Sequence, residues 1–250
     1  MLDLMVRDDA LETVRRTFPV AFGAYAMPAG RTGLVIIDEV QGFASVGCGP
    51  LAPPAPNEQV ARMIAETDRL ARRFVEAGWP VCASLDSHDP AKPEPPYPPH
   101  CLAGSGHDEL VPELKWLEAE PVTTLIAKDC INFFVGAAEL GAELGAGGRN
   151  RLVDWINGHR LEAVVTVGIC TDICVMDFVL TLLSARNHGM MPTLKDVVVY
   201  EPGCATYDLP AEAARSLGLP ETAAHPQGPA HHMGLYMMAS RGALLADTLT

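Results

Sequence analysis

The sequence predicts an α/β protein, a three-layer αβα sandwich with a mainly parallel central sheet. Short, continuously apolar runs alternate along the chain with longer segments of helical periodicity, which is the pattern that right-handed βαβ units produce. The apolar runs lack polar alternation, which is typical of strands covered on both faces. With 250 residues, 48% of them hydrophobic, the chain suits one sizeable core. We therefore expect residues 1–250 to form a single domain.

The individual elements follow from local composition. Residues 1–30 are expected to form a short helical or irregular N-terminal extension that ends at Pro28-Ala29-Gly30. Large apolar and β-branched residues predict strands at residues 34–37, 80–85, 122–127, 161–168 and 193–200. Helical periodicity predicts helices at residues 58–77, 109–117, 132–140, 152–159, 175–187, 209–217 and 234–247. A Gly-rich link spans residues 141–148, and the Pro-rich loop 86–107 is long enough to suggest a function.

Charge and cysteine content exclude several classes of partner. The chain has 31 acidic and 18 basic residues, a net charge of −13, and such a field repels nucleic acid and anionic membranes. No apolar run approaches the roughly 18 residues that span a bilayer, and the acidic N-terminus does not resemble a signal peptide. The seven cysteines, an odd number, are expected to be reduced thiols of a cytoplasmic protein. The apolar helices are compatible with a homo-oligomer, which we expect.

Reactive side chains follow three of the predicted strands. Asp38 follows the first strand, Lys128 the third, and Cys174 begins the helix after the fourth. The carboxyl ends of parallel strands meet at one edge of a sheet. A helix N-terminus favours a thiolate, so Cys174 is a candidate nucleophile, Asp38 its proton acceptor and Lys128 their electrostatic partner. Taken singly, Asp38 could instead cap a turn and Lys128 could form a structural ion pair.

A second set of residues has the composition of a metal site. Asp86 and His88 end the second predicted strand, and His100 lies on the Pro-rich loop beyond it. In an extended segment, residues i and i+2 point to the same side. One carboxylate and two imidazoles suit Zn²⁺, Fe²⁺ or Mn²⁺ with open coordination positions. Alternatively, the histidines are exposed loop residues.

Other cysteines and histidines are less specific. Cys170 and Cys174 could be a redox pair or half of a metal site, although no second cysteine pair stands at zinc-ribbon spacing. His225, His231 and His232 form a C-terminal group, interpreted as helix-entry or interface residues or as a second metal site.

Together these residues resemble the isochorismatase-like cysteine hydrolases, and among them the plant-type nicotinamidases. The resemblance extends over nearly the whole chain from Thr32. It is carried by Asp38, Asp86-Ser87-His88, Tyr97-Pro98-Pro99-His100-Cys101, Lys128 and Gly168-Ile169-Cys170-Thr171-Asp172-Ile173-Cys174-Val175. It implies that Cys174 is the nucleophile, Asp38 the general base and acid, and Lys128 their partner. The backbone N–H groups of Cys170 and Cys174 would form an oxyanion hole, beside a cis peptide between Ile169 and Cys170.

The resemblance also implies a metal and a substrate. Asp86, His88 and His100 would bind one divalent ion, zinc first, with iron or manganese as alternatives. Phe43 and Tyr97 would hold a pyridine ring, with Ile169 as a further contact; many relatives have Trp where Tyr97 stands. The implied reaction converts nicotinamide to nicotinate and ammonia through a cysteine thioester, as part of NAD salvage.

Three alternatives remain open at this point. The first is a related cysteine amidohydrolase that acts on another small amide. The second is a non-haem iron oxygenase, because two histidines and a carboxylate also make its facial triad. The third is an inactive binding or scaffold protein.

Overall fold

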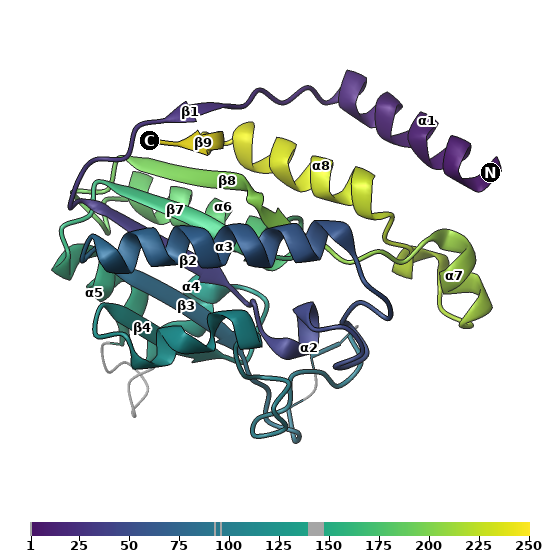
Figure 1. Ribbon diagram of the computed structural model, residues 1–250, viewed down its shortest axis with the longest axis horizontal. Coiled ribbons are helices and arrows are strands. Elements are labelled where there is room, and N and C mark those ends of the chain that lie inside the picture. Colours follow the sequence, from purple (N-terminus) through teal and green to yellow (C-terminus); the bar gives the residue numbers. More distant parts are fainter. Residues whose placement is uncertain (1, 93, 96, 140–147) are drawn as a thin grey trace.

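The protein is built around one seven-stranded sheet, in the strand order β1-β9-β8-β7-β2-β3-β4 (Figure 1). The computed structural model describes residues 2–92, 94–95, 97–139 and 148–250. Every neighbouring pair of strands in this sheet is parallel. The predicted three-layer α/β sandwich is confirmed, with helices on both faces of a parallel sheet.

The elements run as follows. The strands are β1 (Gly23–Tyr25), β2 (Thr32–Ile37), β3 (Val81–Asp86), β4 (Thr123–Lys128), β7 (Ala163–Ile169), β8 (Asp196–Ala205) and β9 (Leu244–Leu249), with β5 (Ala138–Glu139) and β6 (Arg149–Asn150) in a separate antiparallel pair. The helices are α1 (Leu2–Thr17), α2 (Gln41–Ala44), α3 (Glu58–Glu76), α4 (Phe133–Gly136), α5 (Arg151–Gly158), α6 (Cys174–Asn187), α7 (Ala211–Ser216) and α8 (Gln227–Ala239). Two short 3-10 helices are η1 (Pro112–Ala119) and η2 (Glu221–Ala223).

Alternate residues of the central strands enter two different cores. In β2, Leu34 and Ile36 pack with α3 and η1, whereas Val35 and Ile37 pack with α5, α6 and α8. All six residues of β2 are buried, which explains why its sequence is continuously apolar. No helix described by the structure is both long enough and apolar enough to cross a membrane.

The strand order places a crevice beside β2. From β2 the chain proceeds outward through β3 to β4, and then returns to the opposite side of β2 as β7. When the loops after two adjacent parallel strands run in opposite directions, a crevice that can bind a ligand forms at the carboxyl ends of those strands. The ends of β2 and β7 are therefore where a site is expected.

The C-terminal prediction was wrong in part. A helix was expected at residues 234–247, but α8 ends at Ala239 and Leu244–Leu249 forms β9, which pairs with β8 and β1. Gly242 lies between the two elements with a φ of 100°. Short apolar runs do not distinguish strand from helix by periodicity, so the pairing with β8 decides the outcome.

Smaller differences occur elsewhere. The extension 1–30 contains α1 and also β1, which joins the main sheet, and α1 lies alongside α8 (Figure 1). Residues 112–119 form a 3-10 helix where an α-helix was expected at 109–117. The helix expected at 132–140 is only four residues long, Phe133–Gly136, followed by β5. Residues 140–147, which include most of the Gly-rich link, lie outside the described residues.

Candidate active site

The predicted residues meet at one edge of the sheet. Asp38 follows β2, Asp86 ends β3, Lys128 ends β4, and Cys174 begins α6 after β7. Asp86 and Lys128 are direct register partners on adjacent strands. The convergence follows from the parallel pairing, because β2, β3, β4 and β7 all have their carboxyl ends at the same edge of the sheet.

Lys128 is the electrostatic centre of this site. Its Nζ lies 2.8 Å from Asp38 Oδ2 and 2.8 Å from Asp86 Oδ1, and donates to the Cys130 carbonyl at 2.9 Å. The lysine side chain is completely buried, as is that of Asp38. Burial alone would lower the pKa of Lys128, but Asp38, Cys174 and Asp86 raise it well above its ordinary value. The lysine is therefore a permanent cation that links the carboxylate beside the thiol with a carboxylate of the metal-ligand set.

Ser84 orients Asp38, and sequence reasoning missed it. The Ser84 hydroxyl donates to Asp38 Oδ1 at 2.7 Å and accepts the Asp38 backbone N–H at 3.1 Å. Asp38 itself has a φ of 52°, a left-handed conformation that aspartate tolerates better than most residues. Burial raises the pKa of the Asp38 carboxyl, and Lys128 opposes this shift. The carboxyl group is thus suited to hold a proton within a dry site. The signal that could have identified Ser84 is its position on β3, two residues before Asp86.

A tight turn presents Cys174 to the site. It begins at Gly168, whose φ is 125° and where an added Cβ would lie 2.1 Å from the Ile37 carbonyl oxygen, so only glycine fits against β2. The peptide between Ile169 and Cys170 is cis, as the resemblance implies. No side chain among the described residues caps α6, although the Val175 N–H of its first turn donates to the Cys170 carbonyl at 3.1 Å.

The protonation state expected for Cys174 was wrong. A helix end was expected to favour the thiolate, but burial raises the pKa of Cys174 well above its ordinary value, and the nearby Lys128 lowers it only in part. Asp38 and Cys170 add to the increase. The resting group is therefore a thiol, which must lose its proton when it reacts.

Asp86, His88 and His100 form a compact, buried set of ligand atoms. One atom from each residue lies within 4.8 Å of the others. Among the described residues, Asp86 Oδ2 and His88 Nε2 have no hydrogen-bond partner although both are buried, and they face each other at 3.1 Å. His100 Nδ1 donates to the Pro98 carbonyl at 2.8 Å, and its Nε2 lies 3.3 Å from Asp86 Oδ2, so the ring is held with Nε2 facing the other ligand atoms. These orphaned atoms fit a divalent cation.

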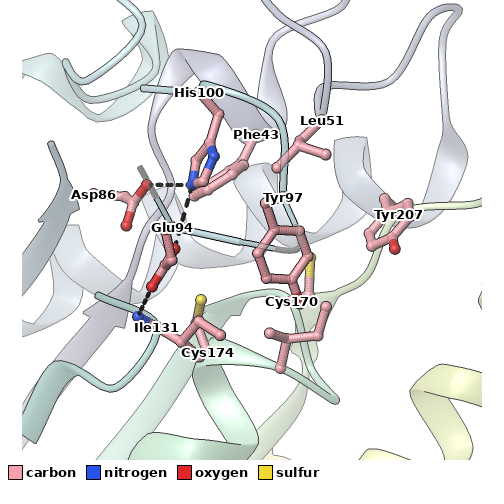
Figure 2. A pocket seen from close by; sticks show the side chains of 11 residues that line it. Phe43, Leu51, Asp86, Glu94, Tyr97, His100, Ile131, Cys170, Cys174 and Tyr207 are labelled. Atoms are coloured by element: carbon pink, nitrogen blue, oxygen red, sulfur yellow. Dashed lines mark hydrogen bonds and ion pairs between the residues drawn. The ribbon is translucent and has the colours of Figure 1, made fainter. Parts of the chain in front are cut away.

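Glu94 lies beside this set, and sequence reasoning missed it as well. Its Oε2 lies 3.6 Å from His88 Nε2 and 3.7 Å from His100 Nε2, and its Oε1 accepts the Ile131 N–H at 2.9 Å. Figure 2 shows the carboxylate between His100 and the loop at Ile131. A fourth oxygen is therefore available near the candidate metal position. Its place in the Pro-rich loop gave no sequence signal.

Cys174 and two members of the metal-ligand set, Asp86 and His100, line one cavity of about 430 Å³, counted out to open solvent. Figure 2 shows the sulfur of Cys174 among the side chains that line it. Phe43 and Tyr97 line it as expected, whereas Ile169 is buried and is not among its lining residues. Of the other lining residues, Leu51, Ile131 and Ile173 are apolar and Tyr207 is aromatic, whereas Asp86, Glu94 and His100 gather the charged and polar groups, with Cys170 as a further thiol. The cavity therefore suits a small, flat molecule with one polar end.

The remaining cysteine and histidine candidates have other surroundings. All seven cysteines are free, and burial raises the pKa of Cys170 to about 12. His225 pairs with Asp172, His231 Nδ1 lies 2.8 Å from Thr171 Oγ1, and His232 Nε2 donates to the Phe18 carbonyl. Within the described parts of the chain, the only set of this kind with metal-binding geometry is Asp86, His88 and His100. His225 and His231 therefore contact the cysteine turn, and His232 separately contacts the segment that follows α1.

A buried thiol, carboxylate and lysine at the carboxyl edge of a parallel sheet define a cysteine hydrolase type of site, and the comparisons agree. Residues 32–247 match the isochorismatase domain, and the chain belongs to the isochorismatase family. Nicotinamidase 1 of Arabidopsis thaliana is 51% identical over 218 residues, which cover 87% of this chain and 86% of that protein.

Solved structures show the same fold. A nicotinamidase of Bacillus subtilis, 22% identical, covers 87% of this chain and 99% of its own, with a TM-score of 0.60. A pyrazinamidase of Pyrococcus horikoshii in complex with zinc, 19% identical, covers 86% and 98%, with a TM-score of 0.55.

Proposed function

We propose that the protein is a nicotinamidase, which hydrolyses nicotinamide to nicotinate and ammonia. The observation that carries the proposal is that Cys174 lines a cavity with aromatic walls, while the paired Asp38 and Lys128 are close enough to shift the pKa of its thiol. The 51% identity with a plant nicotinamidase over most of both chains supports the same substrate.

The reaction is proposed to begin with the thiol of Cys174. Its sulfur forms a bond to the amide carbon while Asp38 takes the thiol proton, and Lys128 stabilises the charges on both. The N–H groups of Cys170 and Cys174 are proposed to donate to the developing oxyanion, a contribution of about 10²–10³ in rate for each such donor. Asp38 then returns the proton to the nitrogen as the carbon–nitrogen bond breaks, which releases ammonia.

The resulting thioester is proposed to react with water. Asp38 accepts a proton from the water as its oxygen bonds to the acyl carbon, and the carbon–sulfur bond breaks. The sulfur takes this proton back from Asp38, which restores the thiol and the carboxylate, and the product leaves as nicotinic acid, which ionises to nicotinate. The apolar lining from Leu51, Ile131 and Ile173 limits bulk water, which favours both proton transfers within the site.

Asp86, His88 and His100 are proposed to hold one zinc ion, with iron or manganese as alternatives. Three protein ligands with open positions are typical of catalytic zinc, and the two orphaned buried atoms of this set require a cation or another partner. When bound, the metal supplies a Lewis-acid contact for a polar atom of the substrate. Phe43 and Tyr97, which both contact the His100 ring, are proposed to hold the pyridine ring beside it.

The wider setting is proposed on separate grounds. The product, nicotinate, is a precursor of pyridine nucleotides, so the enzyme would act in NAD salvage. Seven free thiols support a cytoplasmic location. Pairing of β1 with β9 supports residues 1–250 as one domain.

A homo-oligomer is also proposed, and light scattering would test it.

Release of ammonia from nicotinamide tests the function. We expect Cys174→Ala to keep the fold and to lose ammonia release, and Cys170→Ala, the matched thiol in the same cavity, to retain it because its proposed role is a backbone N–H. Faster turnover of an aliphatic amide than of nicotinamide would favour the related amidohydrolase instead. Substantial activity of Cys174→Ala would refute the nucleophile.

A further inference from the structure

The carboxylate of Asp172 joins the cysteine turn to two distant segments. Thr206, just after β8, donates to Oδ1 at 2.6 Å, and Oδ2 lies 2.7 Å from His225 Nε2, just before α8. Burial would raise the pKa of Asp172, but His225 lowers it below its ordinary value. An ionised carboxylate therefore lies two residues before Cys174 and connects the turn with both segments.

The protonation of His225 follows from its two partners. Its Nδ1 lies 2.9 Å from the Tyr207 carbonyl, which only accepts, and its Nε2 faces the ionised Asp172. Both ring nitrogens must then donate, so the ring is an imidazolium. The His225 backbone also exchanges hydrogen bonds of 2.6 and 2.8 Å with Leu209. The ring is therefore fixed by its main chain and by both nitrogens.

The His225 ring supports a wall of the cavity. Tyr207 stacks on it with ring centroids 3.9 Å apart and an angle of 9° between the planes, and Tyr207 lines the cavity that contains Cys174 (Figure 2). A cation stacked on an aromatic face is attractive. The position of this third aromatic side chain is thus determined by the same carboxylate that anchors the turn.

Helix α8 supports the turn from behind. A Cβ added at Gly234 would lie 2.7 Å from the Asp172 Cα, so the helix backbone contacts the turn directly. His231, also on α8, bonds to Thr171 at 2.8 Å. The cysteine turn therefore cannot move toward α8. The Asp172–His225 pair then fixes its position relative to Tyr207.

We propose that Tyr207 is a specificity-determining residue that binds flat, ring-bearing carboxamides, and that Asp172 and His225 are positioning residues that fix this wall relative to the Cys174 thiol. The inference rests on the proposed amidase function and extends it. It assigns two effects to His225: its ring supports the wall, and its Nε2–H anchors the turn.

Two substitutions separate these effects. His225→Phe keeps a ring against Tyr207 but has no N–H for Asp172, so kcat for nicotinamide should fall while KM changes little. His225→Gln keeps an N–H donor but has no ring, so KM should rise about three- to tenfold, the range of an aromatic contact, with a smaller change in kcat. Tyr207→Leu should raise KM similarly, and adding it to His225→Gln should raise KM little further, because both changes act through one contact. For a small aliphatic amide such as butanamide, KM should not respond.

The experiment measures kcat and KM for nicotinamide and butanamide in the wild type and the variants. The exposed His188 provides the control His188→Gln, which should match the wild type. A merely structural role would lower kcat in both His225 variants alike, with KM unchanged, and would refute the positioning roles. If a His225 variant does not fold, an unchanged KM of Tyr207→Leu would refute the specificity role. A wild type that releases no ammonia from nicotinamide would instead overturn the proposed function.

Discussion

Replacing Lys128 by methionine should be among the most damaging single changes to this protein. The substitution keeps a long side chain of similar volume and removes the ammonium from a buried position. Asp38 and Asp86, each 2.8 Å from Nζ, and the Cys130 carbonyl at 2.9 Å then lose their partner. The buried carboxylate of Asp38 is left without a compensating charge, and that of Asp86 keeps only its contacts with His88 and His100.

The magnitude follows from that geometry. Breaking a buried ion pair by removing one partner typically costs about 3–5 kcal/mol, and here one residue serves two carboxylates. For a chain of this size, each kcal/mol lowers Tm by roughly 2–4 °C, so we expect a decrease of roughly 6–20 °C. Activity should be lost as well, because Asp38 would hold a proton at rest and could not accept one from Cys174.

Urea unfolding with EDTA present measures this cost, because then no bound cation offsets the carboxylates. The matched control is Lys115→Met, which removes an even shorter pair, 2.6 Å to Glu109, between side chains that are 52% and 48% exposed. Surface pairs contribute about 0–1 kcal/mol. Equal losses in the two variants would refute the reasoning that burial makes Lys128 decisive.

Three further predictions use other parts of the structure. Gly168→Ala should lower the free energy of unfolding, measured in urea, by at least ~3 kcal/mol, since its Cβ would overlap the Ile37 carbonyl. The control Gly30→Ala, at a φ of 66° with open space around it, should lower it by ~1–2 kcal/mol. Equal losses would contradict the close approach of β7 to β2. Removal of metal by a chelator should lower the Tm of the wild type, and added zinc should restore it. The Tm of His88→Ala should not respond to zinc. An equal response of the two proteins would argue against Asp86, His88 and His100 as the metal ligands. The pKa of His225 is raised from 6.5, chiefly by Asp172 against the effect of burial, so its stabilisation is full below about pH 6.5 and is lost as pH rises through the raised value. The Tm difference between wild type and His225→Phe should therefore shrink from pH 6 to pH 9, and growth of the difference would refute the ion pair.

Much of the fold could be predicted from local patterns. The buried strands β2, β3, β4 and β7 are apolar runs followed by polar residues, because both faces are covered and the carboxyl ends open on the crevice. The strand β9 was predicted as a helix because its structure depends on distant partners and not on its local pattern. Leu244–Leu249 is a strand only because β8 and β1 offer unpaired edges on either side, and these partners lie far away in the sequence.

The sequence by itself determined which reactive groups the site contains: Asp38, Lys128 and Cys174, with one carboxylate and two histidines beside them. Their residue types and their places at strand ends were sufficient, since parallel strands end at a common edge. Only the tertiary structure decided how these groups interact. Burial, which no local pattern records, turned the expected thiolate of Cys174 into a thiol. Contacts between distant segments joined Lys128 to both carboxylates and placed Ser84, Glu94 and the Tyr207–His225 pair at the site, because strand order and loop packing arise from the whole chain.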